Sequence, residues 1–182
     1  MTISNTILTS VKQNSRLFIE TGTYLGDGVA AALAAGFEKI YSIEFYAARY
    51  NFCCERFANS NNVTLLQGDS SEQLCLLLPS IHEKAVFWLD AHYDACNAEP
   101  EFPIPQADTF PLLKELKYIA AHTIKEHIIL VDDRRIFTGT HPVWKNVTEQ
   151  DVIDALLQIN SQYTITMIDS AHFEKDIIMA SL

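Results

Sequence analysis

Acidic side chains stand at or next to the ends of five apolar, strand-length runs of the sequence. A single Asp or Glu is common at a strand end because these residues also cap helices, but five in succession indicate a site. Gathered carboxyl groups can accept hydrogen bonds from hydroxyl groups or hold a cation. The residues concerned are Glu20, Glu44, Asp69, Asp90 and the adjacent pair Asp132 and Asp133.

The apolar runs alternate with segments of helical pattern. Near-continuous runs of Val, Ile, Leu and Phe are typical of parallel strands buried on both faces. The runs lie at 16–21, 39–44, 63–68, 85–90 and 127–133. This order predicts a doubly wound α/β sheet. Ligands bind such a sheet beyond the carboxyl ends of its strands, which is where the acids lie.

The C-terminal part departs from this alternation. Two strand-like runs, 163–169 and 175–182, are separated only by residues 170–174, which predicts a hairpin with an antiparallel strand. The sequence therefore predicts one domain over residues 1–182. We expect a Rossmann-like, mostly parallel seven-stranded sheet with a C-terminal antiparallel hairpin, preceded by a short N-terminal extension over residues 1–15.

Length and charge exclude several classes of protein. The chain has 182 residues, 48% of them apolar, and a formal net charge of −10. An acidic surface repels phosphates, and Lys and Arg are scattered, so we expect no nucleic-acid partner. No apolar stretch reaches the ~18–20 residues that span a bilayer. Residues 1–15 lack the apolar region of a signal peptide, and we expect no membrane partner.

The four cysteines show no metal-ligand spacing. We interpret them as buried free thiols in a reducing compartment, which predicts a cytoplasmic protein. The sequence leaves the oligomeric state open, with a homodimer as one alternative.

The stretch LFIETGTYLGDG joins the first predicted strand to the first predicted helix. Gly22 and Gly26 would let the backbone approach a ligand, although a tight turn without a ligand has the same requirement. The spacing is not the dinucleotide pattern G-x-G-x-x-G, and Glu20 would repel a pyrophosphate. A cationic or hydroxylated ligand is therefore favoured over NAD.

Glu44 and Asp69 each allow two interpretations. Glu44 ends the second strand, where a carboxylate accepts hydrogen bonds from a ribose diol, but it could also be a solvated strand-end acid. Asp69 could contact the edge of an adenine. It could equally cap a helix, since Glu72 follows three residues later.

Four segments resemble motifs of class I S-adenosylmethionine-dependent methyltransferases: FIETGTYLGDGV, IYSIEF, LLQGDS and FWLDAH. The similarity extends from about Leu17 to Leu182, with Thr23, Tyr24 and Leu25 in place of the family's usual G-x-G. The segments FWLDAHYD, DTFPLLKEL and ILVDDRRIF are also similar to macrocin-type small-molecule O-methyltransferases.

This resemblance implies a role for each candidate residue. Glu20 would face the methionine amino group of S-adenosylmethionine, and residues 22–26 would surround its methionine and ribose parts. Glu44 would bind the ribose hydroxyls, while Asp69 and Ser70 would lie beside the adenine. The implied cofactor-binding residues are Glu20, Gly22, Thr23, Tyr24, Gly26, Glu44, Asp69, Ser70 and Asp90.

Asp90, Asp132 and Asp133 form a second candidate cluster. Converging carboxylates repel one another unless they are protonated or bridged by a cation, and oxygen ligands favour Mg²⁺ over softer metals. Metal-dependent O-methyltransferases use a similar cluster to hold the hydroxyl groups of the acceptor. Alternatively, Arg134 or Arg135 fills the place of the cation.

His92 follows Asp90 by two residues and is the candidate general base. A neutral imidazole can accept the proton of a hydroxyl group near pH 7. The alternative is a loop histidine that binds backbone. Residues 91–107 contain three prolines and no periodicity, and we expect a mobile loop that forms one wall of the acceptor pocket.

These expectations combine into an enzyme that transfers a methyl group from S-adenosylmethionine to a hydroxyl group of a small molecule. Such a reaction requires little beyond alignment of the two reactants and removal of a proton. The alternative is a binding module that keeps the fold and a nucleoside but lacks catalysis. About 15 residues precede the first strand, fewer than in many small-molecule methyltransferases, which favours this alternative.

Overall fold

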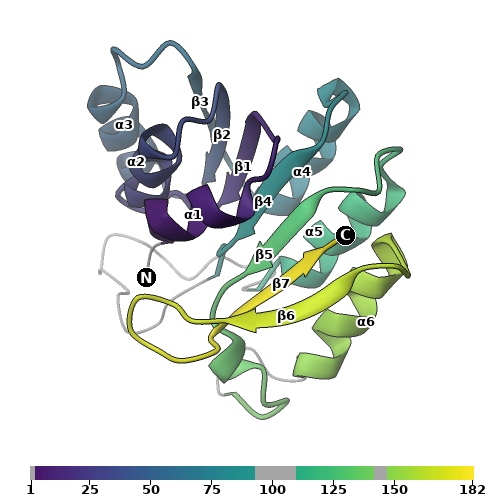
Figure 1. Cartoon of the computed structure of the whole chain (residues 1–182). Coiled ribbons are helices and arrows are strands. Elements are labelled where there is room, and N and C mark those ends of the chain that lie inside the picture. Colours follow the sequence, from purple (N-terminus) through teal and green to yellow (C-terminus); the bar gives the residue numbers. More distant parts are fainter. Residues whose placement is uncertain (1–2, 93–109, 142–146) are drawn as a thin grey trace.

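The computed structural model describes residues 3–92, 110–141 and 147–182 and shows an α/β fold around one sheet (Figure 1). The sheet has seven strands in the order β3-β2-β1-β4-β5-β7-β6. The strands are β1 (Leu17–Thr21), β2 (Lys39–Glu44), β3 (Val63–Gln67), β4 (Ala85–Leu89), β5 (Ile128–Val131), β6 (Thr164–Ile168) and β7 (Ile177–Ser181). Strands β1 to β5 are parallel, and β7 is antiparallel to both β5 and β6. The predicted mostly parallel sheet with its antiparallel hairpin is confirmed.

Helices cover both faces of the sheet (Figure 1). One apolar core joins the sheet to the first three helices and a second core joins it to the last three. The helices are α1 (Asn5–Val11), α2 (Asp27–Ala34), α3 (Ala47–Arg56), α4 (Ser70–Leu77), α5 (Leu112–Ala121) and α6 (Glu149–Ile159), with short 3₁₀ turns η1 (Leu78–Ser80) and η3 (Arg134–Ile136). Strand order reverses between β1 and β4, where a doubly wound sheet binds its ligands.

The central strand β1 sends alternate side chains into the two cores. Leu17 and Ile19 pack in the core with α4 to α6, whereas Phe18 packs in the core with α1 to α3. Because side chains alternate along a strand, Glu20 faces the side of α2 and Thr21 faces the side of α5. The side chains of these two adjacent residues at the end of β1 thus lie on opposite faces of the sheet.

The N-terminal extension contains helix α1, whose Leu8 is fully buried in the core. One expectation needs correction, because not all cysteines are buried: Cys53 is buried but Cys75 is exposed. Cys75 lies in α4, on the side of that helix facing away from the buried residues Leu74 and Leu77.

Candidate active site

Glu20 is a buried carboxyl group at the end of β1. The residue is 2% exposed, and Ser42 on the neighbouring strand donates a hydrogen bond from Oγ to Glu20 Oε2 at 2.5 Å. Oγ1 of Thr23 lies 2.6 Å from the same Ser42 oxygen. Burial raises the pKa of Glu20 to about 8, although the hydrogen bond from Ser42 opposes the shift. Burial therefore favours the uncharged form of the carboxyl group at the start of the glycine turn.

The glycines of this turn are required by the packing of the chain. Gly22 and Gly26 have φ values of +87° and +85°, which disfavour any side chain. A Cβ at Gly22 would lie 2.8 Å from the carbonyl oxygen of Asp90, and one at Gly26 would lie 2.6 Å from the ring of Phe57. The turn is packed between the end of β4 and the end of α3, so the glycines alone do not demonstrate a ligand.

Glu44 joins this turn to the loop after β2. Its Oε2 accepts a hydrogen bond from the backbone N–H of Tyr24, and its Oε1 accepts one from that of Tyr46, both at 2.8 Å. The interpretation of Glu44 as a solvated acid is wrong, because the residue is 4% exposed. Burial raises its pKa, and the two backbone hydrogen bonds oppose that shift.

Tyr24 and Arg49 form the outer side of the same turn. Tyr24 is 47% exposed and has a φ of 51°, which is uncommon for a residue with a side chain. The guanidinium of Arg49 lies 4.5 Å from the centre of the Tyr24 ring and 5.1 Å from that of Tyr46. Sequence patterns did not single out Arg49, which is brought here only by the start of α3.

Asp69 caps helix α4. Its Oδ1 accepts hydrogen bonds from the backbone N–H of Glu72 at 3.1 Å and from Oγ of Ser71 at 2.5 Å. The capping interpretation is confirmed, whereas the contact with adenine stays a prediction. Ser70 is 6% exposed and donates its hydroxyl hydrogen to Glu115 on α5 rather than toward the loop.

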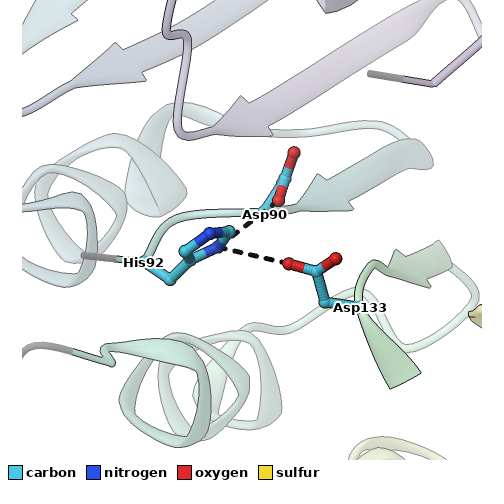
Figure 2. A group of neighbouring side chains, drawn as sticks. All are labelled: Asp90, His92 and Asp133. Atoms are coloured by element: carbon cyan, nitrogen blue, oxygen red, sulfur yellow. Dashed lines mark ion pairs between the residues drawn. The ribbon is translucent and has the colours of Figure 1, made fainter. Parts of the chain in front are cut away.

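Asp90, His92 and Asp133 converge beyond the ends of β4 and β5 (Figure 2). Nδ1 of His92 lies 3.6 Å from Oδ1 of Asp90 and 3.6 Å from Oδ2 of Asp133. Asp133 has a left-handed backbone, with φ of 61°, at the turn that follows β5. The structure therefore brings the candidate base and two of the three candidate metal ligands together.

Asp132 belongs to a neighbouring buried group with Asp133 and Asp176. Arg135 already bridges two of these carboxylates. Its Nη1 lies 2.7 Å from Oδ1 of Asp133 and also forms an ion pair with Asp176. The arginine thus supplies positive charge to the outer part of the cluster, as the sequence alternative proposed.

The inner part of the cluster keeps oxygen atoms without partners. Within the described residues, Oδ1 of Asp90 and Oδ1 of Asp132 are buried and accept no hydrogen bond. Burial and the nearby Asp132 raise the pKa of Asp90 well above its ordinary value. Burial and Asp133 raise the pKa of Asp132 to about 7. Unpartnered carboxylate oxygens with raised pKa values are the arrangement that a hard cation would relieve.

Glu115 is a site residue that sequence patterns missed. It is fully buried on α5, where its carboxyl accepts hydrogen bonds from Ser70 Oγ at 2.5 Å and Thr21 Oγ1 at 3.3 Å. Burial raises its pKa to about 7. A signal was present in the sequence, because Glu115 falls at helical spacing between Leu112 and Ile119 on an otherwise apolar face.

A small pocket at the carboxyl edge of the sheet is lined by Glu115 and by the cluster that contains Asp90, His92, Asp132 and Asp133. Residues 93–109, which contain most of the predicted acceptor loop, lie outside the described residues. The described part of the pocket combines acidic side chains with two phenylalanines and apolar strand ends. Its lining is Leu89, Asp90, Ala91, His92, Phe110, Leu112, Glu115, Val131, Asp132, Asp133 and Phe137.

Comparison with known proteins finds likeness in structure but not in sequence. No family model and no curated protein matches the chain. An O-methyltransferase from Bacillus cereus in complex with SAH has a TM-score of 0.60 at 13% identity, over 97% of this chain and 77% of that one. An SAH-bound methyltransferase from Podospora anserina has a TM-score of 0.61 at 14% identity, over 97% and 75% of the two chains.

A SAM-dependent methyltransferase from Aquifex aeolicus has a TM-score of 0.60 at 13% identity, over 98% of this chain and 89% of that one. The chain has the fold of S-adenosylmethionine-dependent methyltransferases. This finding confirms the fold that the sequence motifs imply, while the macrocin type stays a prediction. Among the described residues, no helix of this methyltransferase fold has the length and apolarity needed to cross a bilayer.

Proposed function

We propose that the chain is an S-adenosylmethionine-dependent methyltransferase that acts on a hydroxyl group of a small molecule. The observation that carries this proposal is the set of carboxyl groups at the carboxyl ends of β1, β2, β4 and β5. Glu20, Glu44 and Asp132 are buried there and the side chain of Asp90 is 10% exposed, in a chain with a methyltransferase fold. Ligands bind doubly wound sheets at this edge.

Glu44 supports the cofactor part of the proposal. Oε2 accepts a backbone hydrogen bond from Tyr24 and Oε1 accepts one from Tyr46, and a carboxylate oxygen can accept more than one hydrogen bond. The remaining acceptor positions suit the two hydroxyls of a ribose. The pair of backbone bonds also fixes the side chain in advance, so that little rotational freedom is lost on binding.

His92 supports the acceptor part. Its Nδ1 lies 3.6 Å from a carboxyl oxygen on either side, so the ring is held between Asp90 and Asp133. The imidazole would accept the hydroxyl proton as the acceptor oxygen bonds to the methyl carbon and the bond from that carbon to sulfur breaks. Nearby carboxylates would stabilise the resulting imidazolium.

Asp90, Asp132 and Asp133 are the proposed ligands of a divalent cation such as Mg²⁺. The buried oxygens of Asp90 and Asp132 that accept no hydrogen bond fit such an ion, and these oxygen donors suit a hard metal. A bound cation would supply Lewis acidity that lowers the pKa of the acceptor hydroxyl. Arg135 is paired with Oδ1 of Asp133, so Oδ2 of Asp133 would be the oxygen available to the ion.

Two measurements test the proposal. Calorimetry with S-adenosylmethionine, SAH and NAD should show binding of the first two only. Transfer of a labelled methyl group to a panel of small hydroxylated molecules should then show turnover. Cofactor binding without turnover on any acceptor class would favour the non-catalytic binding module. Tighter binding of NAD than of SAH would exclude the proposed function.

A further inference from the structure

Glu115 is buried on a helix face where an apolar side chain would be expected. Leu112, Leu116 and Ile119 occupy the same face of α5 and are 2% exposed or less, as Glu115 is. Burial of a carboxyl group costs free energy unless its oxygens accept hydrogen bonds. A leucine here would continue the apolar face, so the carboxyl group calls for an explanation beyond packing.

The two oxygens of Glu115 bind two separate chain segments. Oε1 accepts a hydrogen bond from Ser70, the first residue of α4, and Oε2 accepts one from Thr21, the last residue of β1. Both hydroxyl-bearing residues are buried. One side chain of α5 therefore fixes the end of β1 and the start of α4 relative to each other.

These two segments are the ones that carry the proposed cofactor residues. Thr21 lies between Glu20 and Gly22, and its side chain contacts α5 whereas that of Glu20 lies beside α2 on the opposite side of the sheet. Ser70 directly follows the N-cap residue of α4. A shift of the backbone at Thr21 or Ser70 would also move the neighbouring residues of the same segment. Glu115 can therefore influence cofactor binding although its own contacts are made on the other face.

The same residue lines the pocket with Asp90, His92, Asp132 and Asp133. We propose that Glu115 is a positioning residue that couples the acceptor pocket to the cofactor loops after β1 and β3. The proposal rests on the proposed function, since it takes SAH as the ligand of those loops.

Substitutions at Glu115 separate positioning from a need for its charge. Glu115→Gln keeps an oxygen that can accept from Ser70 and gains an amide that can donate to the Thr21 hydroxyl. We expect this variant to bind SAH within about threefold of wild type. Glu115→Leu removes both bonds, and we expect its Kd for SAH to rise at least about tenfold, because the ends of β1 and α4 are then no longer held in position.

Two controls distinguish positioning from general stability. Ile119→Val lies one turn along the same buried face and should lower the Tm by removing one methyl group, without changing the Kd for SAH. Ser70→Ala should weaken SAH binding, and the double variant Ser70→Ala with Glu115→Leu should bind no more weakly than Glu115→Leu alone. Additive effects would mean that the two residues act separately.

Amide exchange tests the coupling to α5 without an identified acceptor. SAH should slow exchange in α5 of the wild type more than in α6, which packs on the same side of the sheet. Glu115→Leu should remove this difference. If Glu115→Leu does not fold, Thr21→Val and Ser70→Ala replace it in both measurements.

The outcomes keep the two proposals apart. Failure of wild type to bind SAH would contradict the proposed function. Binding of SAH by wild type and, with equal affinity, by folded Glu115→Leu would overturn the role of Glu115 alone. Equal weakening in the Gln and Leu variants would also overturn it, because the ionised group rather than the hydrogen-bond bridge would then be required.

Discussion

The carboxyl group of Glu20 occupies the space that a side chain on Gly28 would need. A Cβ at Gly28 would lie 1.7 Å from Oε1 of Glu20, while Oε2 of Glu20 is held by Ser42. Glycine within a helix costs about 0.5–1 kcal/mol relative to alanine. Helix α2 thus carries a residue of poor helix propensity where the fold places a buried acid.

Gly28→Ala should therefore displace Glu20. We expect the Kd for SAH to rise at least about tenfold, because a carboxyl group displaced by more than an ångström cannot keep its hydrogen bonds. Calorimetry gives the Kd. In the Glu20→Ala background the clash is absent, so the same substitution should instead raise the Tm. Unchanged SAH binding by Gly28→Ala would show that the position of Glu20 does not matter to the ligand.

Glu44→Ala should weaken SAH binding by about 1–3 kcal/mol, the range for hydrogen bonds to a charged group. Calorimetry again supplies the Kd. Glu38→Ala is the matched control, because Glu38 lies next to the start of the same strand and pairs with Arg16 on the exposed surface. Equal affinities for wild type and Glu44→Ala would remove Glu44 as the proposed ribose ligand.

Glu115 predicts a dependence of stability on pH. Its pKa is about 7 in the folded chain, against 4.5 for the ordinary carboxyl, so the folded state binds the proton more tightly. The proton on Glu115 therefore stabilises the folded state. This contribution to the free energy of unfolding is fully present below pH 4.5 and is lost as pH rises through about 7. Relative to Glu115→Gln, wild type should lose on the order of 3 kcal/mol across this window. Urea unfolding at several pH values measures the difference, and a constant difference would contradict the pKa shift.

Removal of divalent cations should abolish methyl transfer and leave SAH binding nearly unchanged. Glu44 accepts its hydrogen bonds from the backbone of Tyr24 and Tyr46, and neither residue is a proposed metal ligand. Turnover is compared with and without EDTA, and Mg²⁺ binding is measured by calorimetry in wild type and Asp132→Asn. Full activity in EDTA would contradict the proposed metal and leave the charge of the cluster to be balanced by Arg135.

His92→Ala should lower turnover by roughly 10²–10⁴-fold, the usual contribution of a general base. Affinity for SAH should not change, so the loss should appear in kcat. His82→Ala is a suitable control because His82 is exposed near the opposite ends of the strands. If turnover by His92→Ala equals that of wild type, His92 is not the base.

The strand-end acids could be located from sequence because buried strands have a recognisable apolar pattern. A strand covered on both faces must be apolar along its whole length, so the first acid after each run marks its end. Parallel order then brings all these ends to one edge. Glu20, Glu44 and Asp90 were found by this reasoning, and so was the antiparallel hairpin, from its short connection.

Tertiary structure alone decided what each carboxyl group contacts. The sequence could not choose between a cap and a ligand contact for Asp69, because both use the same oxygen atoms and only the position of Glu72 shows the cap. Glu115 could not be assigned from the sequence. Helical spacing predicts which face of α5 is buried, but it does not predict which strand ends lie against that face. The sequence thus determined which edge of the sheet carries the carboxyl groups. The packing of α5 on β1 determined the contacts that hold the carboxyl group of Glu115 in place.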